Sequence, residues 1–180
     1  MKLKRVLLFG ASGLLSGAAR EAFLAAGHDV SVVSRGSRPL PPHPRLTPLT
    51  ADRRDAASLS AALSGEEFDF TCDFLAYDGD DVSRLLAVPG FSPGRTVMIS
   101  SGQVYLVTEG RTPPFRESDS EAPLMPAPPE GTRDRREWDY GMGKRAAETT
   151  LRLEASALGF PALALRLLRD AGEPGGDLLL

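Results

Sequence analysis

Tyr140 and Lys144 stand four residues apart in a segment that predicts an α-helix, so their side chains share one face of that helix. A tyrosine has an ordinary pKa of about 10 and is a poor acid or base at neutral pH. A nearby ammonium group stabilises the phenolate and lets the phenol exchange a proton with a substrate carbonyl or hydroxyl. The pair therefore predicts acid–base chemistry, and a chance helical pair is the alternative.

The composition sets Lys144 apart, because lysine otherwise occurs only at positions 2 and 4. Arginine supplies nearly all of the remaining positive charge, so we interpret Lys144 as a functional residue rather than a surface one. Ser101 directly follows a predicted strand over residues 96–100. Its hydroxyl would hydrogen-bond the same substrate oxygen as Tyr140.

A glycine-rich turn joins the first predicted strand, residues 5–9, to the first predicted helix, residues 14–26. Glycine lets the backbone approach a pyrophosphate, and a helix N-terminus adds unpaired N–H groups and the positive end of a dipole. We predict a dinucleotide-binding turn here; a glycine pair that merely ends a strand is the alternative. The residues expected to contact the dinucleotide are Gly10, Ser12, Gly13, Leu14 and Leu15.

The end of the second predicted strand, residues 30–33, indicates which dinucleotide binds. An acidic residue at this place holds the ribose hydroxyls of NAD, whereas a basic residue accommodates the 2′-phosphate of NADP. Ser34, Arg35 and Gly36 stand there, with no carboxylate among them. A hydroxyl beside a guanidinium suits a phosphate, so the expected cofactor is NADP, with NAD as the less favoured choice. A solvated loop arginine is the alternative interpretation.

The order of the elements predicts an α/β fold: a three-layer, doubly wound parallel sheet of about six strands, the Rossmann fold. Further strands are expected over residues 46–49, 68–75 and 161–167, and further helices over residues 55–63, 80–87 and 140–158. Pro48 suits only an edge strand, which is where the third strand of this fold lies. The proline-rich residues 107–137 predict an active-site lid or a disordered loop. We assign residues 1–169 to one domain and residues 170–180 to a short tail.

Bulk properties exclude several classes of function. A net charge of −3 creates no field that would attract nucleic acid, and no apolar run is long enough to span a membrane. Glycines interrupt the apolar segment that follows the basic N-terminus, so we expect no signal peptide and a cytoplasmic location. Cys72 is the single cysteine, and its apolar surroundings predict a buried thiol. We recognise no metal-ligand motif in the sequence, so no metal site is predicted.

Several segments in this order resemble the N-terminal part of the extended short-chain dehydrogenase/reductases, the NAD-dependent epimerase/dehydratase family. They are VLLFGASGLLSG, VVSRG, TADRRD, DFLAY, MISSGQVY and YGMGKRAAE. The resemblance implies that Asp52 contacts the adenine and that Leu75, Ala76 and Tyr77 line the cofactor. It also implies a catalytic triad of Ser101, Tyr140 and Lys144, with Lys144 holding the cofactor as well. A small-molecule substrate and a homodimer are further implications.

The chain departs from the family pattern in three places. The third glycine falls on Ser16, with Gly17 one place late, and Ala51 replaces the usual glycine before Asp52. Leu167 and Leu168 replace a Pro-Pro pair, and the chain ends where the substrate lobe of the family begins. The expected function is thus an NADP-dependent oxidoreductase or epimerase/dehydratase-like enzyme acting on a carbonyl or secondary alcohol. The alternative is a non-catalytic NADP(H)-binding protein, a sensor or complex subunit.

Overall fold

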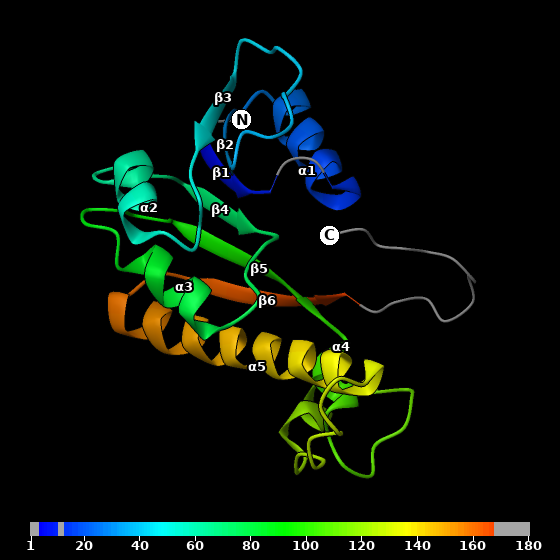
Figure 1. Ribbon diagram of the computed structural model, residues 1–180. Helices are drawn as coiled ribbons and strands as arrows, with labels where there is room; N and C mark the ends of the chain where they lie inside the picture. The colour runs from blue at the N-terminus through cyan, green and yellow to red at the C-terminus, as the bar shows by residue number, and fades with distance from the viewer. Residues whose placement is uncertain (1–3, 11–12, 168–180) are drawn as a thin grey trace.

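Six parallel strands pair in the order β3-β2-β1-β4-β5-β6 in the computed structural model, which describes residues 4–10 and 13–167 (Figure 1). The strands are β1 (Arg5–Phe9), β2 (Asp29–Ser34), β3 (Leu46–Thr50), β4 (Phe70–Asp73), β5 (Arg95–Ser101) and β6 (Ala162–Leu167). The strand order reverses between β1 and β4, as in doubly wound folds. The predicted Rossmann-type sheet is confirmed.

Strand β3 lies at the edge of the sheet and pairs only with β2. Pro48 stands opposite Val32 in this pairing, and the edge position means that its missing N–H group breaks no second ladder. The expected place of this proline-containing strand is confirmed.

Helices cover both faces of the sheet, which confirms the three predicted layers (Figure 1). Helix α1 (Leu14–Ala25) packs Leu24 against the face that carries Val6 and Leu8 of β1. Helices α2 (Ala56–Leu63), α3 (Gly79–Leu86) and α5 (Arg133–Leu158) pack on the opposite face. Two short helices, α4 (Gln103–Leu106) and the 3₁₀ helix η1 (Glu117–Glu121), lie between β5 and α5.

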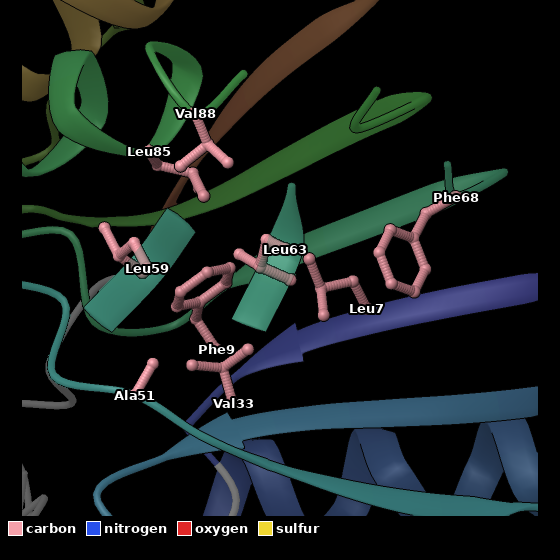
Figure 2. Packing of buried hydrophobic residues seen from close by; sticks show 9 residues of the cluster. All are labelled: Leu7, Phe9, Val33, Ala51, Leu59, Leu63, Phe68, Leu85 and Val88. Atoms are coloured by element: carbon pink, nitrogen blue, oxygen red, sulfur yellow. The ribbon is translucent and has the colours of Figure 1, made fainter. Parts of the chain in front are cut away.

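Strand β1 is buried on both faces, which explains its unbroken apolar run. Its alternate residues Leu7 and Phe9 face α2 and contact Leu59 and Leu63 within one buried cluster (Figure 2). The cluster extends to Val33 on β2 and to Leu85 and Val88 at the end of α3. This core fixes β1, and thereby the position of the glycine turn that follows it.

Helix α5 begins at Arg133, seven residues before the predicted start at Tyr140. The hydroxyl of Thr132 accepts a hydrogen bond of 3.1 Å from the Arg135 N–H group and caps the helix. The arginines at 133–136 therefore stand on the first turn of a helix, and not in the loop predicted over residues 107–137. The charged composition of this turn hid the helix, because it carries no apolar periodicity.

The proline-rich stretch after β5 is packed against its neighbours. The ring of Phe115 stacks on Tyr105 with centroids 5.1 Å apart, and the Glu117 carbonyl accepts from Arg166 at 3.2 Å. The Ser120 carbonyl accepts a hydrogen bond from Arg145 on α5. These contacts hold the stretch against α4, α5 and β6, in place of the disordered loop that the sequence allowed.

Cys72 is buried in the sheet, as predicted, with 6% of its surface exposed. Burial, helped by the negative charge of Asp73, raises the pKa of its thiol to about 12, so the thiol stays protonated and inert at neutral pH. Among the helices of residues 4–10 and 13–167, none is long and apolar enough to cross a membrane.

Candidate active site

The candidate site residues lie at the carboxyl ends of the central strands. Gly10 follows β1, Ser34 ends β2, Leu75 follows β4 by two residues and Ser101 ends β5. Because all the strands are parallel, these ends meet at one edge of the sheet, where β1 and β4 form the switch point of the strand order. The predicted residues at the ends of these strands thus lie at the edge of the sheet where open α/β folds bind their ligands.

Lys144 is held in place by two backbone carbonyls. Its Nζ donates to the oxygen of Ala76 at 2.7 Å and to the oxygen of Ile99 at 2.9 Å, and only 3% of the residue is exposed. The ammonium group also lies 5.1 Å from the ring centre of Tyr77 and 5.7 Å from that of Tyr140. The side chain therefore bridges the segment after β4 and the end of β5, with its charge beside two phenols.

Burial lowers the pKa of Lys144 from 10.5 to about 8, because the charged ammonium group is removed from water. The carboxylates of Asp73 and Asp81 partly oppose this effect, and Arg53 adds to it. The lysine is therefore mostly charged at neutral pH, yet close to its point of titration.

Tyr140 lies beside Ser101, so the predicted catalytic residues are brought together. Burial raises the pKa of the Tyr140 phenol, and its hydrogen bond with Ser101 lowers it in opposition. The Ser101 oxygen also accepts from the Gln103 N–H group at 3.2 Å, which orients the hydroxyl. A protonated phenol, an oriented hydroxyl and a buried cation thus share one site.

Two glycines on α5 that were not predicted as site residues allow the helix to come this close. A Cβ atom on Gly143 would lie 2.6 Å from the carbonyl oxygen of Tyr77, and one on Gly141 would lie 2.8 Å from that of Gln103. The helix therefore touches backbone on both sides of the turn that carries Tyr140 and Lys144. The signal was visible in the sequence as Tyr-Gly-Met-Gly-Lys, because two glycines inside a helix disfavour it unless packing requires them.

The glycine turn has the geometry that close backbone approach demands. Gly10 has φ +92°, and a Cβ atom there would lie 3.1 Å from Leu75. Gly13 is the N-cap of α1, and its N–H group donates to the Ser16 hydroxyl at 3.2 Å. Leu14 is 81% exposed and Leu15 is 41% exposed at the start of the helix, while Ser12 lies outside the described residues, as do Leu168 and the tail.

Gly17 has open space around it, since a Cβ atom there would meet nothing within 4 Å. Its late position in the motif therefore has no packing role in the described part of the chain. Ser16, which takes the place of the third family glycine, is buried and folds its hydroxyl back onto the turn.

Of the residues expected at the adenosine end, Arg35, Gly36 and Asp52 are exposed and Ser34 is half-buried. The Ser34 hydroxyl accepts from the Gly36 N–H group at 3.3 Å, and Gly36 has φ +73°. The Arg35 side chain is exposed and makes no hydrogen bond or ion pair with residues 4–10 or 13–167. The Asp52 carboxylate caps its own turn by accepting from the Arg54 N–H group at 2.9 Å.

A buried ion cluster beneath the site was not foreseen. The guanidinium of Arg53 pairs with both oxygens of Asp73, at 2.8 and 3.0 Å, and its Nε lies 3.2 Å from the Asp81 carboxylate. The weak signals in the sequence were an aspartate at the end of the apolar run before Phe74 and an arginine doublet after β3.

The lowered pKa of Lys144 makes the stability of the fold depend on pH. Between pH 8 and 10.5 the unfolded chain holds a proton on Lys144 that the folded chain has released, so this lysine makes the free energy of unfolding rise with pH. Cys72 acts in the opposite direction above about pH 9, because its raised pKa lets the folded chain keep a proton that the unfolded chain loses. Relative to Lys144→Met, in which the Cys72 effect is the same, we expect the free energy of unfolding in urea to rise by on the order of 2 kcal/mol between about pH 7 and pH 9.5. Lys144→Met should lack this rise, and parallel curves for the two proteins would refute the buried charge.

Comparison with protein-family models finds no match for this chain, and comparison with curated proteins finds none either. Solved structures do match. The Bordetella bronchiseptica enzyme WbmH, solved in complex with NAD⁺, is 20% identical with a TM-score of 0.66; the match covers 96% of this chain and 60% of WbmH. Vestitone reductase from alfalfa is 19% identical with a TM-score of 0.65, covering 91% and 56% of the two chains. UDP-glucose 4-epimerase from Thermotoga maritima, solved with UDP-glucose, is 15% identical with a TM-score of 0.69, covering 90% and 54%.

The matches run along nearly all of this chain, whereas the chain spans less than two thirds of the length of each structure. Identities of this size carry information about the fold and not about the reaction. The chain has the Rossmann-type α/β fold of these three structures, which confirms at the level of the fold the resemblance seen in its sequence.

Proposed function

We propose that this protein binds NADP(H) at the carboxyl edge of its sheet and catalyses oxidoreduction or epimerisation of a small molecule through a carbonyl or secondary alcohol. The observation that carries the proposal is the placement of Lys144. Its ammonium group is fixed by carbonyl oxygens 2.7 and 2.9 Å away and lies beside Tyr140, whose phenol meets Ser101. A buried lysine against a phenol is an arrangement suited to proton transfer.

The residues present fit a dinucleotide. The turn at Gly10 has a conformation that favours glycine, and the first N–H groups of the twelve-residue helix α1 lack acceptors within the helix. Exposed side chains at Leu14 and Leu15 flank these N–H groups. Asp52 and Arg35 follow the ends of β3 and β2, where the proposal puts the adenosine end of the cofactor.

NADPH supplies a hydride when it is bound, and the chain's residues manage the accompanying proton. Tyr140 donates its phenolic proton to the substrate oxygen as the carbonyl carbon is reduced, so a carbonyl becomes an alcohol. Lys144 stabilises the phenolate that remains, and the Ser101 hydroxyl holds the same substrate oxygen by a hydrogen bond. The phenolate then regains a proton from solvent. In the opposite direction Tyr140 first releases its proton to solvent, and the phenolate, stabilised by Lys144, then accepts the proton of the alcohol.

The preference for NADP rests on Arg35, whose guanidinium has no other partner among the described residues. We expect Arg35→Asp to weaken NADPH binding about 10- to 100-fold, because a charge-assisted hydrogen bond to phosphate is lost and a like charge is introduced. NADH binding should change by less than about threefold. Side-by-side fluorescence titrations of the two nucleotides measure this difference.

Arg152→Asp is the matched control, since it makes the same change in net charge at an exposed position on α5. It should leave the ratio of the two affinities unchanged. Equal losses for NADPH and NADH in Arg35→Asp would contradict the assignment of Arg35 to the 2′-phosphate.

The second candidate function is NADP(H) binding without turnover, as a sensor or a subunit of a complex. It needs only the glycine turn after β1 and the residues that follow β2 and β3. Nucleotide binding in titration, with no oxidation or reduction across a broad panel of carbonyls and alcohols, distinguishes it from the enzyme. The homodimer and the cytoplasmic location stay predictions.

A further inference from the structure

The backbone turn that holds Lys144 is fixed from both sides by carboxylates. Asp73 Oδ1 accepts a hydrogen bond of 2.8 Å from the Leu75 N–H group, and Asp81 Oδ2 accepts one of 2.9 Å from the Tyr77 N–H group. Between these two anchored amides lies Ala76, whose carbonyl binds the Lys144 ammonium group at 2.7 Å. The conformation of residues 75–77 therefore fixes the Ala76 carbonyl that binds Lys144.

Both carboxylates are held by the same guanidinium. Arg53 pairs in a bidentate manner with Asp73 and contacts the side chain of Asp81 at 3.2 Å and its backbone oxygen at 3.2 Å. The side chains are 11%, 5% and 6% exposed for Arg53, Asp73 and Asp81. The ring of Phe9 lies 5.5 Å beneath the guanidinium. Arg53 thus joins the end of β4 to the start of α3 across the turn.

The charges of this cluster balance, and this makes Arg53 hard to replace. Arg84 lies 3.5 Å from the Asp81 carboxylate, so two arginines face two aspartates. Removing Arg53 would leave Asp73 buried and without its ion pair, a much less favourable state than the intact cluster. The carboxylates would then turn toward water and release the amides of residues 75–77.

We propose that Arg53 is a positioning residue for Lys144, which acts by holding Asp73 and Asp81 against the turn that presents the Ala76 carbonyl. This role rests on the proposed function, because it explains how the cation beside Tyr140 is kept in place. It also links the two ends of the cofactor site, because Arg53 directly follows Asp52, the residue expected at the adenine.

The experiment reads out the turn and the lysine in nucleotide-free protein. Amide hydrogen exchange at Leu75 and Tyr77 reports the turn, and NMR of ¹³C-labelled lysine reports Lys144. The chain has three lysines, so the spectrum is simple, and Lys144→Arg assigns the signal. In Arg53→Met, we expect exchange at both amides to accelerate about tenfold or more and the pKa of Lys144 to rise by about one unit or more, because a nearby positive charge is lost.

Four charged groups shift the pKa of Lys144: Arg53, Asp73, Asp81 and Glu148. The phenols of Tyr77 and Tyr140 also face its ammonium group. Arg53→Lys keeps the charge but cannot bridge both carboxylates in the same way, so it should accelerate exchange at the two amides with a smaller change in the pKa of Lys144. This split separates positioning from simple electrostatics.

Arg45→Met is the control, because Arg45 pairs with Asp29 at 3.1 Å on the exposed surface between β2 and β3. It should change neither signal. A folded Arg53 variant with unaltered amide exchange and an unaltered Lys144 titration would overturn the proposal, and if both Arg53 variants fail to fold, the same measurements on Asp81→Asn decide. A wild-type protein that binds no NADPH would refute the proposed function and leave the positioning result standing.

Discussion

Replacing Tyr140 by Phe is expected to lower turnover about 10²- to 10⁴-fold, the range for loss of a positioned acid or base. The ring stays, so its contacts with Tyr77 and Lys144 remain, and only the proton-bearing oxygen beside Ser101 is lost. Affinity for NADPH should stay within about twofold of the wild type, because the phenol serves the proton transfer and not the nucleotide. Turnover is followed by the absorbance of reduced nicotinamide on a panel of carbonyls and secondary alcohols.

Tyr105→Phe is the matched control, since it removes the same hydroxyl from a buried tyrosine outside the site. That hydroxyl accepts from Arg166 at 3.0 Å, so the variant should lose about 1 kcal/mol of stability and keep its activity. Full turnover in Tyr140→Phe would show that the proton is carried by another group, and the assignment of the triad would be wrong.

The fold could be predicted because its signals are local. The apolar run of β1, the glycine at the end of α1 and the Asp55 cap of α2, which accepts from the Ala57 N–H group at 2.9 Å, each specify an element by themselves. Pro48 even identified the edge strand. The length of β4 was overestimated, because Asp73 ends it by turning to accept from the Leu75 N–H group.

The sequence was sufficient to identify the side chains of the candidate site, but not the groups that hold those side chains in place. Tyr140 and Lys144 can be recognised by their helical spacing. The carbonyls that bind Lys144 come from Ala76 and Ile99, which are distant in sequence and whose residue types indicate no function. Backbone carbonyls carry no sequence signature. The cluster around Arg53 was missed for a related reason: Arg53, Asp73 and Asp81 lie far apart in the sequence, and only the folded chain brings them together.

The close approach of α5 yields the second large effect. In Gly143→Ala the new Cβ atom would lie 2.6 Å from the Tyr77 carbonyl oxygen, which is backbone and cannot rotate away. The helix must therefore move outward and draw Lys144 from the Ala76 carbonyl. We expect a loss of about 1–3 kcal/mol in the free energy of unfolding, the usual effect of overpacking, and a fall in NADPH affinity of about tenfold or more.

Gly17→Ala tests this reasoning, because it is the same substitution in a helix where a Cβ atom meets nothing within 4 Å. Alanine is the better helix former, so this variant should gain about 0.5–1 kcal/mol. If the free energy of unfolding in urea falls in Gly143→Ala and rises in Gly17→Ala, the contact with Tyr77, and not helix propensity, is the reason for glycine at position 143. If Gly143→Ala gained stability as Gly17→Ala does, there would be space for a methyl group between α5 and the Tyr77 carbonyl. The close approach of α5 could then not be what holds Lys144 at the site.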